Sequence, residues 1–79
     1  MTLTPGQIRA ARALIGWTQE QLADASAITT RTLMRLEAGE TAARASTASR
    51  LRDALAAAGV EFIAENGGGP GVRLRKVRG

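Results

Sequence analysis

The sequence predicts a mainly α-helical protein, with four short helices followed by a C-terminal β-hairpin. Capping residues and glycines punctuate residues 4–59, and apolar residues recur every three or four positions between them. After Gly59 the pattern changes to two short alternating runs on either side of a stretch rich in glycine and proline. Because a chain of 79 residues has room for one small domain, residues 1–79 are assigned to a single domain.

The first two helices share an N-terminal signal. Residues 4–7 (TPGQ) have the order of a capping box with proline in the first helical position, which predicts a helix over residues 5–15. Residues 18–21 (TQEQ) form a second capping box and predict a helix over residues 18–25. The inner face of the first helix is expected to hold Ile8, Ala11 and Ile15.

The third and fourth helices follow from a cap at one end and a glycine at the other. A helix is predicted over residues 29–38 with Thr29 as its cap. Another is predicted over residues 47–58, with Ser46 or Thr47 as its cap. The apolar stripe expected on this last helix consists of Ala48, Leu51, Leu55 and Ala58.

The chain after Gly59 is expected to form a hairpin, with strands at about residues 60–64 and 72–76. Between them lie residues 67–71 (GGGPG), which cannot continue a helix or a strand. One apolar face, expected against the fourth helix, would comprise Val60, Phe62, Val72 and Leu74. Ile63 would fall on the opposite face. Since a lone hairpin is barely stable in water, it must pack on the helices or pair with another chain.

Composition excludes several classes of function. The net charge is +4, and all of the excess lies in the last eight residues, because residues 1–71 hold seven basic and seven acidic residues. The chain has no cysteine and no histidine, which rules out disulfides and removes the commonest metal ligand and catalytic base. We therefore expect no enzyme, no metal and no cofactor. Without a membrane span or a signal-peptide pattern, we expect a cytoplasmic protein.

The most informative segment is residues 18–41, which has the form of two short helices joined by a tight turn. The small Ala23 suits their close approach. The shared core is expected to contain Leu22, Ile28, Leu33 and Leu36. With these turned inward, Arg31 and Arg35 project together from the outer side of the second helix, since they are four residues apart. Trp17, which precedes the segment, is expected to pack rather than to stack on a base.

This segment resembles the Cro/cI-type helix-turn-helix family of bacterial and phage regulators, also called the xenobiotic-response-element family. The matching segments are residues 16–19 (GWTQ), 21–23 (QLA), 29–33 (TTRTL) and 36–39 (LEAG), with residues 8–12 (IRAAR) similar to the family's first helix. The resemblance covers about residues 3–58. It implies a lambda-repressor-like bundle that binds double-stranded DNA, with the helix at residues 29–38 in the major groove.

The resemblance also implies roles for individual residues. The positions that it places at DNA bases are Thr29, Thr30, Arg31 and Arg35. The positions that it places at DNA phosphates are Thr18, Gln19 and Arg44. Glu37 matches a structural glutamate that ties the recognition helix to Arg9 or Arg12 of the first helix. Ala27 departs from the family, which usually has glycine there, and a left-handed alanine costs about 1 kcal/mol.

The resemblance also predicts a biological role and partners. A repressor or autoregulator would act on a palindromic operator as a homodimer, joined through the hairpin at Phe62, Ile63 and Leu74. The alternative is an antitoxin-like module that binds a partner protein, with DNA binding secondary or lost. Met34 would either contact thymine methyl groups or lie on the protein surface without contacting DNA.

The basic end of the chain has three possible uses. Its cations are Arg73, Arg75, Lys76 and Arg78. They could follow the DNA backbone, guard a dimer edge strand with their charge, or form a solvated end.

Overall fold

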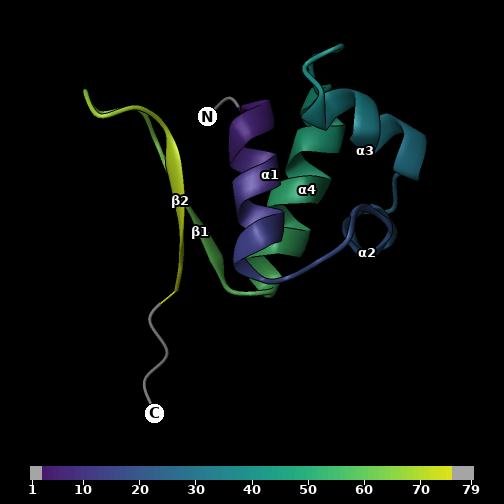
Figure 1. Cartoon of the computed structure of the whole chain (residues 1–79), viewed down its shortest axis with the longest axis horizontal. Coiled ribbons are helices and arrows are strands. Elements are labelled where there is room, and N and C mark those ends of the chain that lie inside the picture. Colours follow the sequence, from purple (N-terminus) through teal and green to yellow (C-terminus); the bar gives the residue numbers. More distant parts are fainter. Residues whose placement is uncertain (1–2, 76–79) are drawn as a thin grey trace.

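In the computed structural model, residues 3–75 are described, and they form four α-helices and a two-stranded antiparallel sheet. The elements in chain order are α1 (Pro5–Leu14), α2 (Gln19–Ala25), α3 (Thr30–Glu37), α4 (Ala45–Ala57), β1 (Val60–Ile63) and β2 (Gly71–Leu74). Figure 1 shows α2 and α3 at one end of the molecule, the hairpin at the other, and α1 and α4 between them. The predicted order of four helices and a hairpin is confirmed.

Both predicted capping boxes form, and they set where α1 and α2 begin. The Gln7 N–H donates to Thr4 Oγ1 at 3.1 Å, and the Thr4 N–H donates to Gln7 Oε1 at 3.0 Å. Thr18 and Gln21 repeat this reciprocal pair at 3.1 and 2.8 Å. Each box satisfies two N–H groups that the first helical turn would otherwise leave without partners.

The predicted start of α4 was wrong. The helix begins at Ala45, with Arg44 as its cap residue, rather than at Thr47 after a hydroxyl cap. Arg44 is extended (φ −65°, ψ 155°), and its carbonyl already accepts the first helical hydrogen bond from the Ala48 N–H at 2.9 Å. Ser46 and Thr47 therefore lie inside the first turn. Their hydroxyl groups suggested a helix cap in the sequence, but neither residue is the cap of α4.

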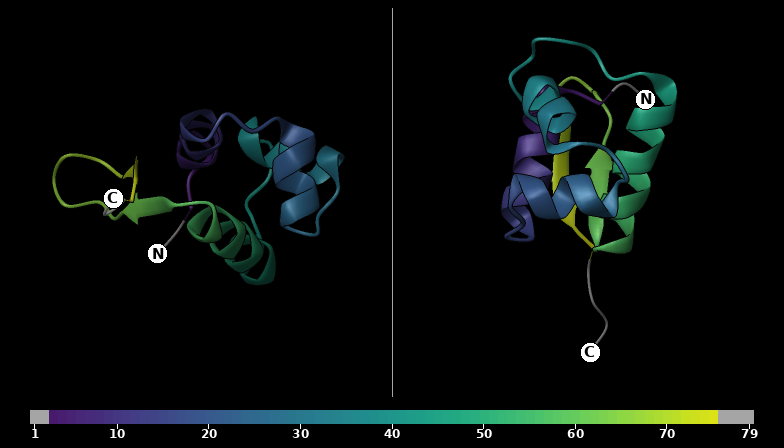
Figure 2. Two further views of the ribbon diagram at one scale, coloured as in Figure 1. Left: turned by 90° about the horizontal axis from the view of Figure 1, so that it is seen from below. Right: turned by 90° about the vertical axis from the view of Figure 1, so that its right-hand side faces the viewer.

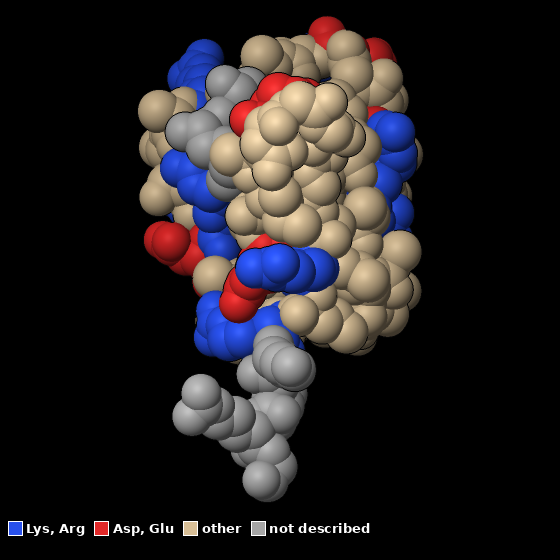
Figure 3. All heavy atoms as spheres, turned by 90° about the vertical axis from the view of Figure 1, so that its left-hand side faces the viewer, with Lys and Arg blue, Asp and Glu red and all other residues tan. Residues whose placement is uncertain are grey.

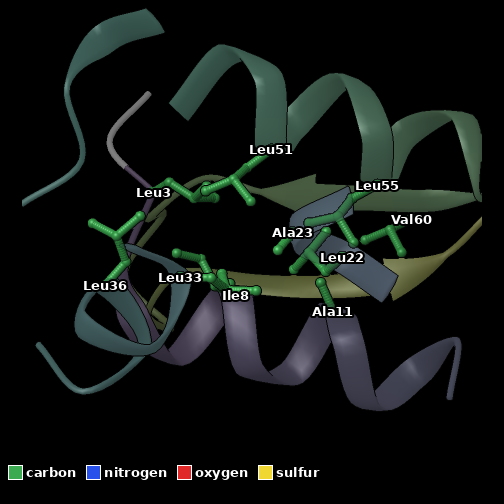
Figure 4. Close-up of a cluster of buried hydrophobic side chains, with 10 residues drawn as sticks. All are labelled: Leu3, Ile8, Ala11, Leu22, Ala23, Leu33, Leu36, Leu51, Leu55 and Val60. Carbon is green, nitrogen blue, oxygen red and sulfur yellow. The ribbon is translucent and has the colours of Figure 1, made fainter. Parts of the chain in front are cut away.

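The core is a single cluster that draws on the N-terminal segment, all four helices and β1. Its buried members are Leu3, Ile8, Ala11, Leu22, Ala23, Leu33, Leu36, Leu51, Leu55 and Val60. Figure 4 shows Leu51 and Leu55 of α4 pointing toward α1, with Leu22 between the two helices. Trp17 is half-buried and packs against this cluster, as predicted. Such a core fixes α2 and α3 against the rest of the molecule.

The hairpin was expected to pack on the fourth helix alone. It packs on both α1 and α4. Phe62 and Val72 are cross-strand partners, and both pack against the core. The buried Gln7 side chain donates from Nε2 to the Gly71 carbonyl at 3.1 Å and to the Ile63 carbonyl at 3.4 Å. One side chain of α1 therefore holds the ends of both strands.

The strands are shorter than predicted, and one of their apolar residues is not covered. β1 ends at Ile63 and β2 spans Gly71–Leu74, while Lys76 and Arg78 lie outside the described residues. Leu74, the last residue of β2, was expected against a helix but is half exposed. Within residues 3–75, no helix is long and apolar enough to cross a membrane.

Candidate nucleic-acid interface

The α2–α3 unit is held by a tight turn that contains a strained residue. Ala27 adopts the left-handed conformation (φ 57°), and the Ile28 N–H donates to the Ala23 carbonyl at 3.0 Å. The turn thus keeps the left-handed geometry at the position where the family usually has glycine. The buried side chains of Leu22 and Leu33 join the two helices through the core. Figure 2 (right) shows α2 and α3 together on the face of the molecule nearest the viewer.

The outer side of α3 carries cations and no exposed acid. Arg31 and Arg35 are exposed and lie one helical turn apart, with Met34 exposed beside them. Thr30 is half-buried at the start of the helix. The acidic residue of α3, Glu37, is buried. The structure therefore brings the predicted arginines onto one surface.

Thr29 caps α3, and this occupies its hydroxyl group. Its Oγ1 accepts from the Thr32 N–H at 3.1 Å and lies 2.9 Å from Thr32 Oγ1, to which it donates. The hydroxyl proton of Thr32 remains able to donate to a ligand. Thr32 is exposed and was missed in the sequence analysis, although its position three residues before Arg35 places it on the same side of α3.

Glu37 is the hub that joins α1, α2 and α3. Its carboxylate is 4% exposed and accepts two hydrogen bonds from Arg12, each 2.9 Å long. Arg9 donates to the Glu37 carbonyl. Arg12 also donates to the Trp17 carbonyl at 3.1 Å, which ties the α1–α2 loop to the same hub. The hydrogen bond with Glu37 raises the pKa of Arg12 above its ordinary value. The predicted tie between the third and first helices is confirmed.

Gln19 reaches the same hub from the start of α2. It is half-buried, and its Nε2 donates to Glu37 Oε1 at 3.2 Å. An amide nitrogen has two hydrogens, so one remains to donate to a phosphate. Thr18, next to it, donates its N–H in the capping box and accepts at Oγ1, which leaves its hydroxyl proton to donate. Both of these predicted phosphate ligands therefore keep a donor hydrogen.

Arg44 and α3 line a hollow of about 360 Å³. The hollow lies between α3 and the start of α4. Its polar lining consists of Thr32, Arg35, Thr41, Arg44 and Thr47. Arg44 is exposed, and within the described residues its side chain makes no capping bond to α4. A predicted base-reading arginine and a predicted phosphate-binding arginine thus face one space.

Arg73 in β2 and Arg75, which directly follows β2, lie at the other end of the molecule, where Figure 1 shows β2. Arg73 Nε lies 3.0 Å from Glu61 Oε2, and Arg75 Nε lies 3.9 Å from Glu61 Oε1. Arg75 also donates to the Ala56 carbonyl at 3.3 Å. Both side chains are held against the hairpin and α4, away from α3. They do not extend the basic surface of the helix-turn-helix.

Comparison with known families decides the identity of this fold. The family model described as Helix-turn-helix (HTH_3) matches residues 8–60, well over half of the chain. The chain belongs to the Cro/cI-type helix-turn-helix family. Members are DNA-binding regulatory domains rather than enzymes, so this helix-turn-helix domain is a DNA-binding regulator. The matched residues include α2, α3 and α4 but only the first residue of the hairpin. The comparison with curated proteins found no match.

Proposed function

We propose that this helix-turn-helix protein binds double-stranded DNA sequence-specifically as a small transcriptional repressor or autoregulator, acting at the nucleoid, with α3 in the major groove. The observation that carries the proposal is the pair Arg31 and Arg35, exposed on one side of a capped helix that is free of exposed acid. The guanidinium fork matches the O6 and N7 acceptors of guanine. Thr30 lies at the N-terminal end of α3, the end that approaches base edges in this motif.

Thr29 has a narrower role in this proposal. Because its hydroxyl caps α3, it contributes to base recognition through its methyl group, which suits contact with a thymine methyl. Thr32 supplies the free hydroxyl donor that Thr29 lacks.

Phosphate contacts would flank α3 on two sides. Gln19 and Thr18 stand at the start of α2, where the helix dipole favours an anion. Arg44 stands across the hollow beside Arg35. Such contacts fix the orientation of the protein on the duplex without reading its sequence.

We further propose a homodimer joined at the hairpin end. One short recognition helix makes a small interface, and a second copy on a palindromic operator doubles it, with half-sites one helical turn (~34 Å) or a multiple apart. Of the three predicted dimer residues, Leu74 is the most available, being half exposed. Ile63 lies on the outer face of the hairpin, and Phe62 lies on the inner face against the core.

The alternative is an antitoxin-like module that binds a partner protein and has lost its DNA site. A recognition helix released from DNA binding would be free to acquire acids or large apolar residues on its outer side. The outer side of α3 instead holds Arg31, Arg35 and two threonines, with Met34 as its large apolar residue. This composition favours DNA as the main partner.

Selection from random duplex DNA tests the proposal. The wild-type protein should enrich a palindrome whose half-sites are one or two helical turns apart. Enrichment of a single unrepeated half-site would contradict the homodimer. A pool that stays random at low salt, while the protein remains folded, would contradict sequence-specific binding.

A further inference from the structure

The loop between β1 and β2 contains the one asparagine of the chain, and a glycine follows it. Asn66 and Gly67 are both exposed, and Gly67 has a positive φ of 99°. Figure 2 (left) shows this loop reaching away from the helices. A Cβ atom at Gly67 would meet no atom of the described residues within 4 Å, so the Gly67 nitrogen is not crowded. The nitrogen is therefore open to a reaction with the amide side chain that precedes it.

Deamidation at such a pair is a ring closure followed by hydrolysis. The Gly67 nitrogen loses its proton to hydroxide and bonds to Asn66 Cγ. The Cγ–Nδ2 bond then breaks, and the amide nitrogen takes a proton from water and leaves as ammonia. A second water molecule opens the cyclic imide at one of its two carbonyl carbons. Opening at Cγ gives aspartate, whereas opening at the main-chain carbonyl carbon gives isoaspartate, in which the main chain runs through the side chain.

The Asn66 side chain is already folded toward the atoms that react. Its Oδ1 accepts from the Gly68 N–H at 3.4 Å, so the side chain turns forward along the chain, past the Gly67 nitrogen. This hydrogen bond is longer than the usual length of about 2.9–3.0 Å, so it holds the side chain weakly. A small rotation of the side chain can therefore bring Cγ against the Gly67 nitrogen.

Glu65 holds the Gly67 nitrogen more firmly. The Gly67 N–H donates to Glu65 Oε1 at 2.8 Å, and the same oxygen accepts from the Gly69 N–H at 2.9 Å. Within residues 3–75, no lysine or arginine forms an ion pair with Glu65, so no cation neutralises its charge. A hydrogen bond to the neutral N–H and a negative charge beside it both oppose loss of the proton. Glu65 therefore opposes the first step of the ring closure.

We propose that Asn66 is a site of spontaneous deamidation, and that the Glu65 carboxylate slows the reaction by holding the Gly67 N–H. The product would carry a second carboxylate beside Glu65, and isoaspartate would also add a methylene group to the main chain. Both changes work against the two hydrogen bonds that Glu65 accepts, so the loop would lose its present geometry.

The change would be confined to the loop. Gln7 holds the Ile63 and Gly71 carbonyls, which are the strand ends on either side of it. The loop also lies at the opposite end of the molecule from α3 (Figure 1). Neither DNA binding nor dimerisation enters this chemistry.

The second glutamate of the hairpin provides a matched control. Glu61 accepts from Arg73 at 3.0 Å, and among the described residues it accepts from no amide of the loop. Figure 3 looks onto the hairpin end and shows acidic side chains against basic ones in its lower part. Glu61→Ala therefore removes the same charge from the same hairpin and leaves the hydrogen bond from Gly67 to Glu65 in place.

Mass spectrometry of protein kept at moderately alkaline pH tests the proposal. Deamidation replaces an amino group by a hydroxyl group, and a peptide map assigns this mass change to Asn66. The reaction should be about tenfold faster in Glu65→Ala than in the wild type, because a hydrogen bond to a charged group is lost. Glu65→Gln keeps an acceptor without the charge and should fall between the two. Glu61→Ala should match the wild type.

Unfolding separates the role of the structure from that of the sequence. In concentrated guanidinium chloride, the wild type and Glu65→Ala should react at nearly the same rate, because the unfolded chain does not keep the hydrogen bond from Gly67 to Glu65. A tenfold difference that persists in the unfolded chain would overturn the proposed role of Glu65.

The remaining outcomes also decide the question. Equal rates in folded wild type and Glu65→Ala, or an equal acceleration by Glu61→Ala, would overturn the role of Glu65. No conversion at Asn66 in any variant, or a mass change that survives Asn66→Ser, would overturn the site itself. If circular dichroism shows Glu65→Ala to be unfolded, Glu65→Gln replaces it and should still react faster than the wild type.

Discussion

Glu37 at the helix-turn-helix end is 4% exposed and receives two hydrogen bonds from Arg12, whereas Glu61 at the hairpin end is 36% exposed and pairs with Arg73. The first pair joins three helices through a buried carboxylate. The second lies on the surface between two strands. The same chemistry therefore has different consequences: near α3 it fixes three helices relative to one another, and at the hairpin it holds Arg73 against the neighbouring strand.

The largest expected effect comes from removing these two carboxylates in parallel. Glu37→Ala should lower the free energy of unfolding by about 3 kcal/mol, because it leaves Arg12 and Gln19 without their buried partner. Glu61→Ala is the matched control and should cost less than about 1 kcal/mol. Urea denaturation measures both. Equal losses would contradict the contrast between the two ends.

The pH dependence of the Glu37 pair follows from Arg12. Because pairing with Glu37 raises the pKa of Arg12, the pair stabilises the fold fully at any pH below the ordinary arginine pKa, and this stabilisation is lost only as the pH rises through the higher native pKa. The contribution of Arg12 should therefore stay constant across neutral and moderately alkaline pH.

Gln7→Ala should have the next largest effect, on the hairpin end. It removes the bonds to the Ile63 and Gly71 carbonyls and half of the α1 capping box, at a cost of about 1–2 kcal/mol. Amide exchange in β2 should accelerate more than in α3. A uniform acceleration across both would show that Gln7 does not anchor the hairpin separately.

Ser26→Ala should stabilise the helix-turn-helix end. The Ser26 hydroxyl is buried, and it has no hydrogen-bond partner within the described residues. Removing it should raise the free energy of unfolding by about 1 kcal/mol, since a buried polar group without a partner is destabilising. A loss of stability in thermal unfolding would show that the hydroxyl has a role in the turn.

Ala27→Gly should give the smallest effect. Glycine relieves the left-handed strain at φ 57°, worth about 1–2 kcal/mol, but loses more backbone entropy on folding, worth about 0.5–1 kcal/mol. A net gain of about 0.5 kcal/mol is expected by urea denaturation. Gly39→Ala is the converse control at φ 75° and should be destabilising.

Local signals explain why so much of the fold was predictable. The capping boxes at Thr4 and Thr18 and the apolar spacing of α1 and α4 involve residues three or four positions apart, so the chain itself specifies them. The same reasoning failed at α4, where Ser46 and Thr47 offered a cap that the backbone did not use.

Contacts between distant parts of the chain were not predictable from local patterns. The bonds from Gln7 to the hairpin span more than 50 residues, and Gln19 reaches Glu37 across 18. The exposed arginines of α3 were predicted, but Thr32 was not, because the sequence does not show which of the two hydroxyls, Thr29 or Thr32, keeps a free proton. The spare donors of a site depend on which hydrogen bonds the fold has already formed.

Binding of arginine variants to the selected operator tests the central claim most directly. Arg31→Ala and Arg35→Ala should each weaken specific binding by about 1–3 kcal/mol and relax the preference at one base-pair position. Arg73→Ala removes the same charge at the opposite end and should change the preference at no position. Unchanged base preference in both α3 variants, with affinity reduced only as in Arg73→Ala, would contradict base reading by α3.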